Sequence, residues 1–222
     1  ATRPTVMAAS TRDTIPSDAW IAGVLAAAIG GALTVYGALY GDAAWTFAQA
    51  EPRYGEVARG RMGSVVELDA LTQALRASPA RADLSRAAFV QMVTAQRVGL
   101  NSLRAVTRLS AARRDLRLGL RASPSDAYAW TRLAVVEHRL GHTAAAAAAL
   151  NMALQVAPAE RKLTAMQFDL AVTLWTVLAR PAKTALERRL VWAEQWPDLA
   201  TVVVSNSADA LRKRLAAERA GE

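Results

Sequence analysis

The sequence contains no cysteine and very little lysine. The absence of cysteine excludes disulfide bonds and thiol catalysis, but it does not distinguish an oxidising from a reducing compartment. Lysine occurs only at Lys162, Lys183 and Lys213, so the net charge of +8 comes almost entirely from arginine. Glycine and proline are too sparse for a collagen-like or mainly disordered chain. The 222 residues suffice for one good-sized domain with an appendage.

The N-terminal part of the sequence differs in composition from the rest. Residues 1–18 are polar and rich in Thr, Ser and Pro, which predicts a disordered tail. Residues 19–41 carry no charge, and as a helix they would span roughly 34 Å, enough to cross a membrane. An aromatic belt is suggested by Trp20 at one end and by Tyr36, Tyr40 and Trp45 at the other. We therefore predict a transmembrane helix over 19–41; the alternatives are a buried Ala/Gly-rich helix or an uncleaved signal sequence.

Three small residues within this segment lie four apart, at Gly23, Ala27 and Gly31. On a helix they share one groove, where a second helix could approach closely, so we predict a helix-packing role for them. Chance spacing in an Ala-rich segment is the alternative. By analogy with bacterial single-pass anchors, we expect the inner (cytoplasmic) membrane as the location and a periplasmic main domain. The flanking arginines do not decide the side.

The remaining chain is predicted to be helical after a connector at 42–61, which contains Pro52 and Gly55. From residue 62 to 219, apolar residues recur at helical spacing, ending in a basic amphipathic helix. Residues 199–204, LATVVV, are open to two interpretations, a short strand or the start of a helix. The motif LRASP occurs twice and LQVAP follows once, which indicates a degenerate repeat.

The clearest repeat is the stretch 127–158, AYAWTRLAVVEHRLGHTAAAAAALNMALQVAP. Its regularly spaced residues are Trp130, Leu133, Ala134, Gly141, Ala146, Leu150, Ala153 and Pro158. This spacing resembles the tetratricopeptide repeat (TPR), in which small residues let two antiparallel helices pack closely and a proline ends the second. Glu137 departs from the pattern, which usually has a large residue there. The resemblance implies an all-α superhelix of three to four hairpins behind the transmembrane helix.

The resemblance also implies a binding groove on the first helix of this hairpin. Its groove positions are Tyr128, Thr131, Val135, His138 and Arg139. Such a mixed aromatic, polar and basic surface would suit a peptide or loop of a protein partner. The alternative is a shallow groove that neighbouring helices partly cover.

The densest positive charge lies on one predicted helix, at Arg104, Arg108, Arg113, Arg114, Arg117 and Arg121. We predict that Arg114, Arg117 and Arg121 form a patch for an acidic partner, lipid headgroups or an anionic polysaccharide. A solvated helix face is the alternative. No nucleic-acid-binding motif is evident, so we do not expect nucleic acid as a partner.

The sequence offers little that points to chemistry. His138 and His142 are four apart, but Gly141 should end their helix, and EHRLGH lacks the HExxH arrangement. We expect solvated or capping histidines, no metal, no cofactor and no catalytic residue. The carboxylates Asp115 and Glu137 are expected in solvated ion pairs, as is Asp169. Three tryptophans, Trp175, Trp192 and Trp196, could form a sugar-stacking platform, but core positions are favoured.

These observations favour a non-enzymatic, membrane-anchored scaffold that binds a protein partner. The layout is similar to that of small bacterial envelope proteins associated with exopolysaccharide or O-antigen assembly. The alternative is a structural accessory subunit of a respiratory or photosynthetic membrane complex, held through its first helix. An enzyme would require an activity that no motif in the sequence predicts.

Overall fold

The structure is a computed structural model that describes residues 17–61, 63–78, 80–81 and 83–221. Side chains are not described at 17–22, 36, 39, 40, 42–44, 46, 47 and 221, and the predicted tail falls almost wholly outside the described residues. The described part of the chain forms helices and short 3-10 turns and contains no strand, which confirms the predicted all-α class. Residues 199–204 accordingly include a short helix, α9 (Ala200–Val203).

The chain divides into two compact units, residues 1–42 and 43–222. Helix α1 (Ser17–Ala58) contributes to both and contains the predicted span. Among the described residues, no helix combines the length and the apolar character needed to cross a membrane, so the prediction of a transmembrane helix at 19–41 is not supported. Much of the segment is alanine and glycine, which favour the membrane interior less than leucine or isoleucine does.

The predicted connector at 42–61 is helical as far as Ala58, so α1 continues through Pro52. Proline lacks an N–H and disfavours the interior of a helix. Here Ala50 and Val57, on either side of it, are buried in a cluster with Leu68 and Leu71. Tertiary packing of this face therefore outweighs the local signal that predicted a break.

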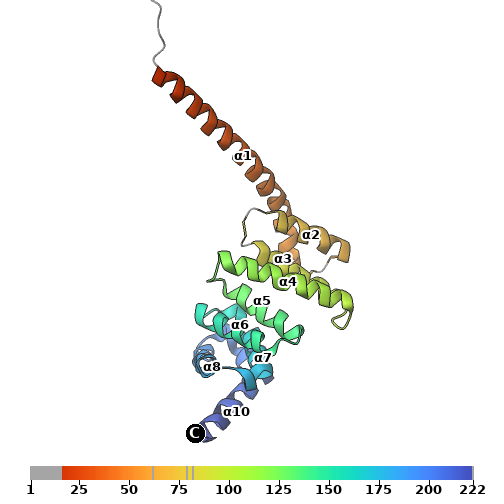
Figure 1. Cartoon of the computed structure of the whole chain (residues 1–222). Coiled ribbons are helices and arrows are strands. Elements are labelled where there is room, and N and C mark those ends of the chain that lie inside the picture. Colours follow the sequence, from red (N-terminus) through yellow and green to blue (C-terminus); the bar gives the residue numbers. More distant parts are fainter. Residues whose placement is uncertain (1–16, 62, 79, 82, 222) are drawn as a thin grey trace, which may run out of the picture. The chain divides into compact units, whose positions relative to one another are not determined.

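The second unit continues as a succession of helices, which Figure 1 shows in chain order from α2 to α10. They are α2 (Val65–Ala77), α3 (Asp83–Arg97), α4 (Leu103–Ala122), α5 (Ala127–Arg139), α6 (Thr143–Val156), α7 (Thr164–Leu174), α8 (Arg180–Ala193), α9 and α10 (Asn206–Gly221). From α2 to α6 each helix packs against the next, whereas α7 and α8 pack against α6 and α10.

Side-chain caps fix where several of these helices begin. Ser64 and Glu67 form a capping box at α2, and Ser102 and Asp126 cap α4 and α5. Gly141 follows the last residues of α5 and has a φ of 81°. Glycine adopts this left-handed conformation without a steric penalty, so it can end the helix here. The hairpin predicted at 127–158 is therefore present as α5 and α6.

Equivalent helices of neighbouring hairpins lie in register. Asp69 on α2 accepts a hydrogen bond from Arg108 on α4 at 2.7 Å. Asp115 on α4 accepts one from Arg76 on α2 at 2.9 Å. In each pair the two residues are 39 positions apart in the sequence. Two contacts with the same offset mean that α2 and α4 run in the same direction. This arrangement is compatible with a helical repeat architecture.

The C-terminal end of α6 is closed by a buried arginine. The Arg189 side chain from α8 donates to the carbonyl oxygens of Ala157 and Pro158, both at 3.0 Å, and to that of Glu160. Burial lowers the pKa of Arg189 to about 10, so the guanidinium remains charged at neutral pH. Arg189 thus satisfies carbonyl groups that the end of a helix and its following turn leave unpaired.

We expect Arg189→Gln to destabilise the protein by about 1–3 kcal/mol, because buried carbonyl groups lose their donors. Arg188→Gln is the matched control, because Arg188 is exposed. Its effect should stay within about 0.5 kcal/mol. Urea denaturation of the full chain measures both, and equal losses would contradict the assigned role.

Candidate functional site

The groove predicted on α5 is partly closed. Thr131 is completely buried, and its Oγ1 accepts a hydrogen bond from Gln167 Nε2 of α7 at 3.0 Å. Tyr128 is half-buried, and its pKa is raised by burial and by a hydrogen bond with the Glu160 carboxylate. Val135 and His138 are half-buried and Arg139 is exposed. Thr131 is therefore unavailable to a partner, and the next hairpin occupies part of the face that the resemblance assigned to binding.

An open cleft lies where α4, α5 and α6 meet, with a volume of about 530 Å³. Its floor is formed by the buried side chains of Leu120, Leu133 and Ala149, one from each helix. Arg117 and Arg121 of α4 line it on one side. Ala145, Ala148 and Met152 of α6 also line it, and Trp130 and Glu137 complete the lining from α5.

This cleft is on the opposite face of α5 from the predicted groove. Trp130, Leu133 and Glu137 recur at intervals of three and four residues, so they share one face of the helix. Leu133 and Val135 are two positions apart, about 200° around the helix axis. The residues predicted to form a binding groove on α5 therefore do not line this cleft, and their role in binding a partner stays a prediction.

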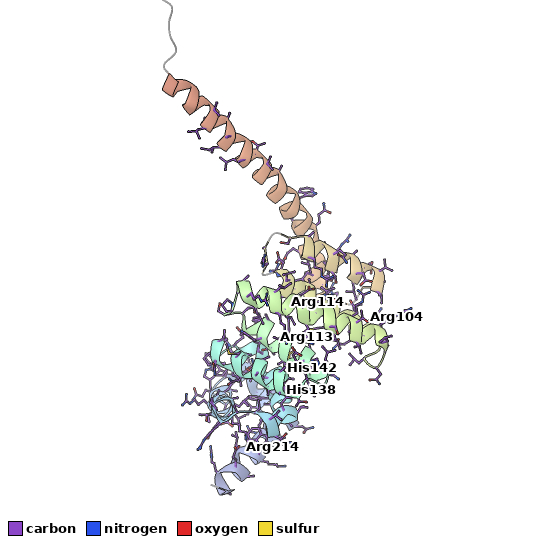
Figure 2. The ribbon with its side chains drawn as sticks, in the orientation of Figure 1. Arg104, Arg113, Arg114, His138, His142 and Arg214 are labelled. Carbon is purple, nitrogen blue, oxygen red and sulfur yellow. The ribbon has the colours of Figure 1, made fainter. Side chains whose placement is uncertain are left out.

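Glu137 connects the cleft to a buried ion-pair network. Its side chain is 1% exposed, and its Oε1 accepts a hydrogen bond from Arg117 Nη2 at 2.8 Å and forms an ion pair with Arg113 Nε at 3.1 Å. Its Oε2 lies 2.7 Å from Nδ1 of His142. Figure 2 shows Arg113 and His142 in the region where α4, α5 and α6 come together. The expectation of a solvated ion pair was wrong for Glu137, because three helices cover this carboxylate.

Asp115 is a second buried carboxylate that sequence reasoning placed in solvent. It is 7% exposed and accepts from Arg76 Nε at 2.9 Å and from Gln91 Nε2 at 2.7 Å. Such burial is tolerated because both partners donate to the charged form. Asp169, by contrast, is exposed as expected.

The predicted arginine patch divides between two roles. Arg114 and Arg121 are exposed, and no ion pair joins either of them to another described residue. Arg117 is tied to Glu137, although half of its side chain is exposed. Only Arg117 and Arg121 line the cleft. Arg113, which the sequence placed only within the dense positive charge of this helix, belongs to the buried network through its ion pair with Glu137.

The histidines and tryptophans occupy separate places. His142 stands at the start of α6 but bonds to Glu137 and makes no capping bond to the helix. Within the described residues, no group of three potential metal ligands comes together. Trp175 is buried as predicted, whereas Trp196 is 39% exposed. Its ring lies 5.9 Å from that of Trp192 and under the guanidinium of Arg161.

The small-residue groove predicted on α1 is open within the first unit. A Cβ atom added at Gly23 or Gly31 would meet no atom within 4 Å, and Ala27 is exposed. Large apolar side chains on the same stretch are also exposed, among them Leu25 and Leu33. The predicted packing role of this groove stays a prediction.

We expect Glu137→Ala to destabilise the full chain by about 1–3 kcal/mol, because buried hydrogen bonds between charged groups are lost. The control is Asp198→Ala, which breaks an ion pair with Arg161 whose partners are both about half exposed. Its cost should be below about 1 kcal/mol. Chemical denaturation distinguishes the two, and a smaller loss for Glu137→Ala would contradict the network's structural role.

Comparison with known proteins matches the chain to no protein family, no curated protein and no solved structure. The fold class of this protein therefore rests on its helices and their contacts: the chain is an all-α protein with a repeat-like arrangement of helices.

Proposed function

We propose that this protein is a non-enzymatic scaffold of the helical-repeat type that binds a protein partner in the cleft between α4, α5 and α6. The open cleft with an apolar floor carries this proposal. Its lining combines buried leucines, small alanines and a half-buried tryptophan with two arginines. Apolar centres bordered by arginine are typical of protein-binding surfaces.

The composition of α6 supports the same function. Its sequence, TAAAAAALNMALQV, contains no charged residue, and Ala144 and Ala148 are exposed. An exposed uncharged helix face next to an apolar cleft favours contact with another protein over full solvation. The neighbouring hairpins hold this face in place, since Ala146 and Leu150 on its inner side are fully buried.

The finer identification as a TPR-like superhelix belongs to the same proposal. It is supported by the hairpin of α5 and α6, by the fully buried small residues Ala134 and Ala146, and by the register of α2 and α4. Membrane anchoring, a place in the bacterial envelope and participation in exopolysaccharide or O-antigen assembly remain predictions from the sequence.

A second candidate is a structural accessory subunit of a larger complex, held through α1. The observation that favours it is the uncovered groove at Gly23, Ala27 and Gly31, where a helix of another protein could approach closely. The two functions place the binding energy on different units of the chain, so they can be separated by mutation.

We expect Ala148→Glu to reduce the recovery of a co-purifying partner by at least about tenfold, because a charge is forced against an apolar contact. The partner is first identified by purifying the tagged full chain from its native cells in mild detergent. Ala165→Glu is the control, since Ala165 is an exposed alanine on α7 away from the cleft.

The same experiment with Gly31→Leu tests the second candidate. Retention of the partner by Gly31→Leu and its loss by Ala148→Glu would support the scaffold. The reverse pattern would reject binding in the cleft and favour an accessory subunit held through α1.

A further inference from the structure

We propose that the cleft between α4, α5 and α6 binds an amphipathic helix that carries two carboxylates one turn apart. This inference rests on the proposed function and specifies the chemistry of the partner. It follows from the spacing of the charges, from the dimensions of the apolar surface and from the charge of the whole chain.

The positive charges that line the cleft are Arg117 and Arg121, whereas Glu137, the third charged residue of the lining, is 1% exposed and paired with Arg117. The two arginines are four residues apart on α4, so they lie one turn apart on the same face. Arg121 is exposed and forms no ion pair with another described residue. Arg117 gives one N–H to Glu137 at 2.8 Å, and a guanidinium has five such donors. Both can therefore receive a carboxylate, and Glu137 holds Arg117 in position to do so.

The apolar surface matches about two turns of a helix. On α6, Met152 lies seven positions after Ala145 with Ala148 between them, which corresponds to about 10 Å along the helix axis. Alanine side chains allow a second helix to approach closely, and the floor at Leu120 and Leu133 can take the larger side chains of that helix. A helix with apolar residues at positions i, i+3, i+4 and i+7 fits this length.

The overall charge argues against a second copy of this chain as the occupant. The net charge is +8, and a symmetric contact would bring Arg117 and Arg121 of two copies to the same interface. An acidic partner instead gains electrostatic complementarity and a faster encounter. Charge complementarity therefore favours an acidic helix.

The test uses the full chain and two synthetic helical peptides of identical composition, labelled for fluorescence anisotropy. Both carry the same leucine face, but one has two glutamates at i and i+4 and the other has them at i and i+2, on different sides of the helix. We expect the first to bind saturably and about tenfold more tightly than the second. Arg121→Glu should weaken its binding by at least about tenfold.

Arg104→Glu is the matched control, because it makes the same charge change at an exposed residue of the same helix that does not line the cleft. It should alter the affinity by less than about twofold. Equal binding of the two peptides, equal effects of the two arginine variants, or no binding of either peptide would overturn the inference. If a native partner still depends on Ala148 while neither peptide binds, the scaffold function stands and the acidic helix is rejected.

An anionic polysaccharide is the remaining occupant to be tested, with polygalacturonate as the probe. If polygalacturonate binds with a dependence on Arg121 and displaces the first peptide, while Ala148→Glu leaves peptide binding unchanged, the arginines serve the polymer and the inference fails. If Ala148→Glu weakens peptide binding by about tenfold and polygalacturonate does not compete, the helix is supported.

Discussion

Close approach of neighbouring helices, made possible by alanine, underlies the second unit of this protein. Fully buried alanines occur on successive helices, among them Ala88 on α3, Ala112 on α4, Ala134 on α5 and Ala146 on α6. Their small side chains bring the helix backbones near one another, and the few large residues fill the spaces that remain. The cleft depends on the same constraint, because the alanines of α6 leave room between α4 and α6 that larger side chains would fill.

Buried ion pairs add specificity to this packing. Asp115 and Glu137 lie between helices, and each accepts hydrogen bonds from arginine. An unpaired carboxylate there would be costly, so each pair favours one arrangement of the helices over a sliding contact between similar alanine faces. Glu137 has a further consequence, since it holds Arg117 at the cleft. The arrangement of the core thus determines the charge that a partner meets.

The candidate functions use different parts of this organisation. A scaffold would use the rigid second unit, where Arg117 and Arg121 border an apolar floor. An accessory subunit would use α1, whose small residues between positions 23 and 31 are uncovered in the first unit. The cleft offers both a shape and a charge pattern, whereas the groove of α1 offers only a shape. The structure therefore gives more specific support to the scaffold.

By itself, the sequence determined the helical class, the hairpin at 127–158 and the positions of its turns, because periodicity, capping residues and Gly141 act over a few residues. It also singled out Arg117 and Arg121 as part of a patch.

Only the tertiary structure decided which face of α5 remains open, since α7 covers Thr131 and leaves the side of Leu133 accessible. It likewise decided that Asp115 and Glu137 are buried and that α1 continues through Pro52. Those outcomes depend on residues up to 39 positions apart in the chain, whose contacts no local pattern encodes.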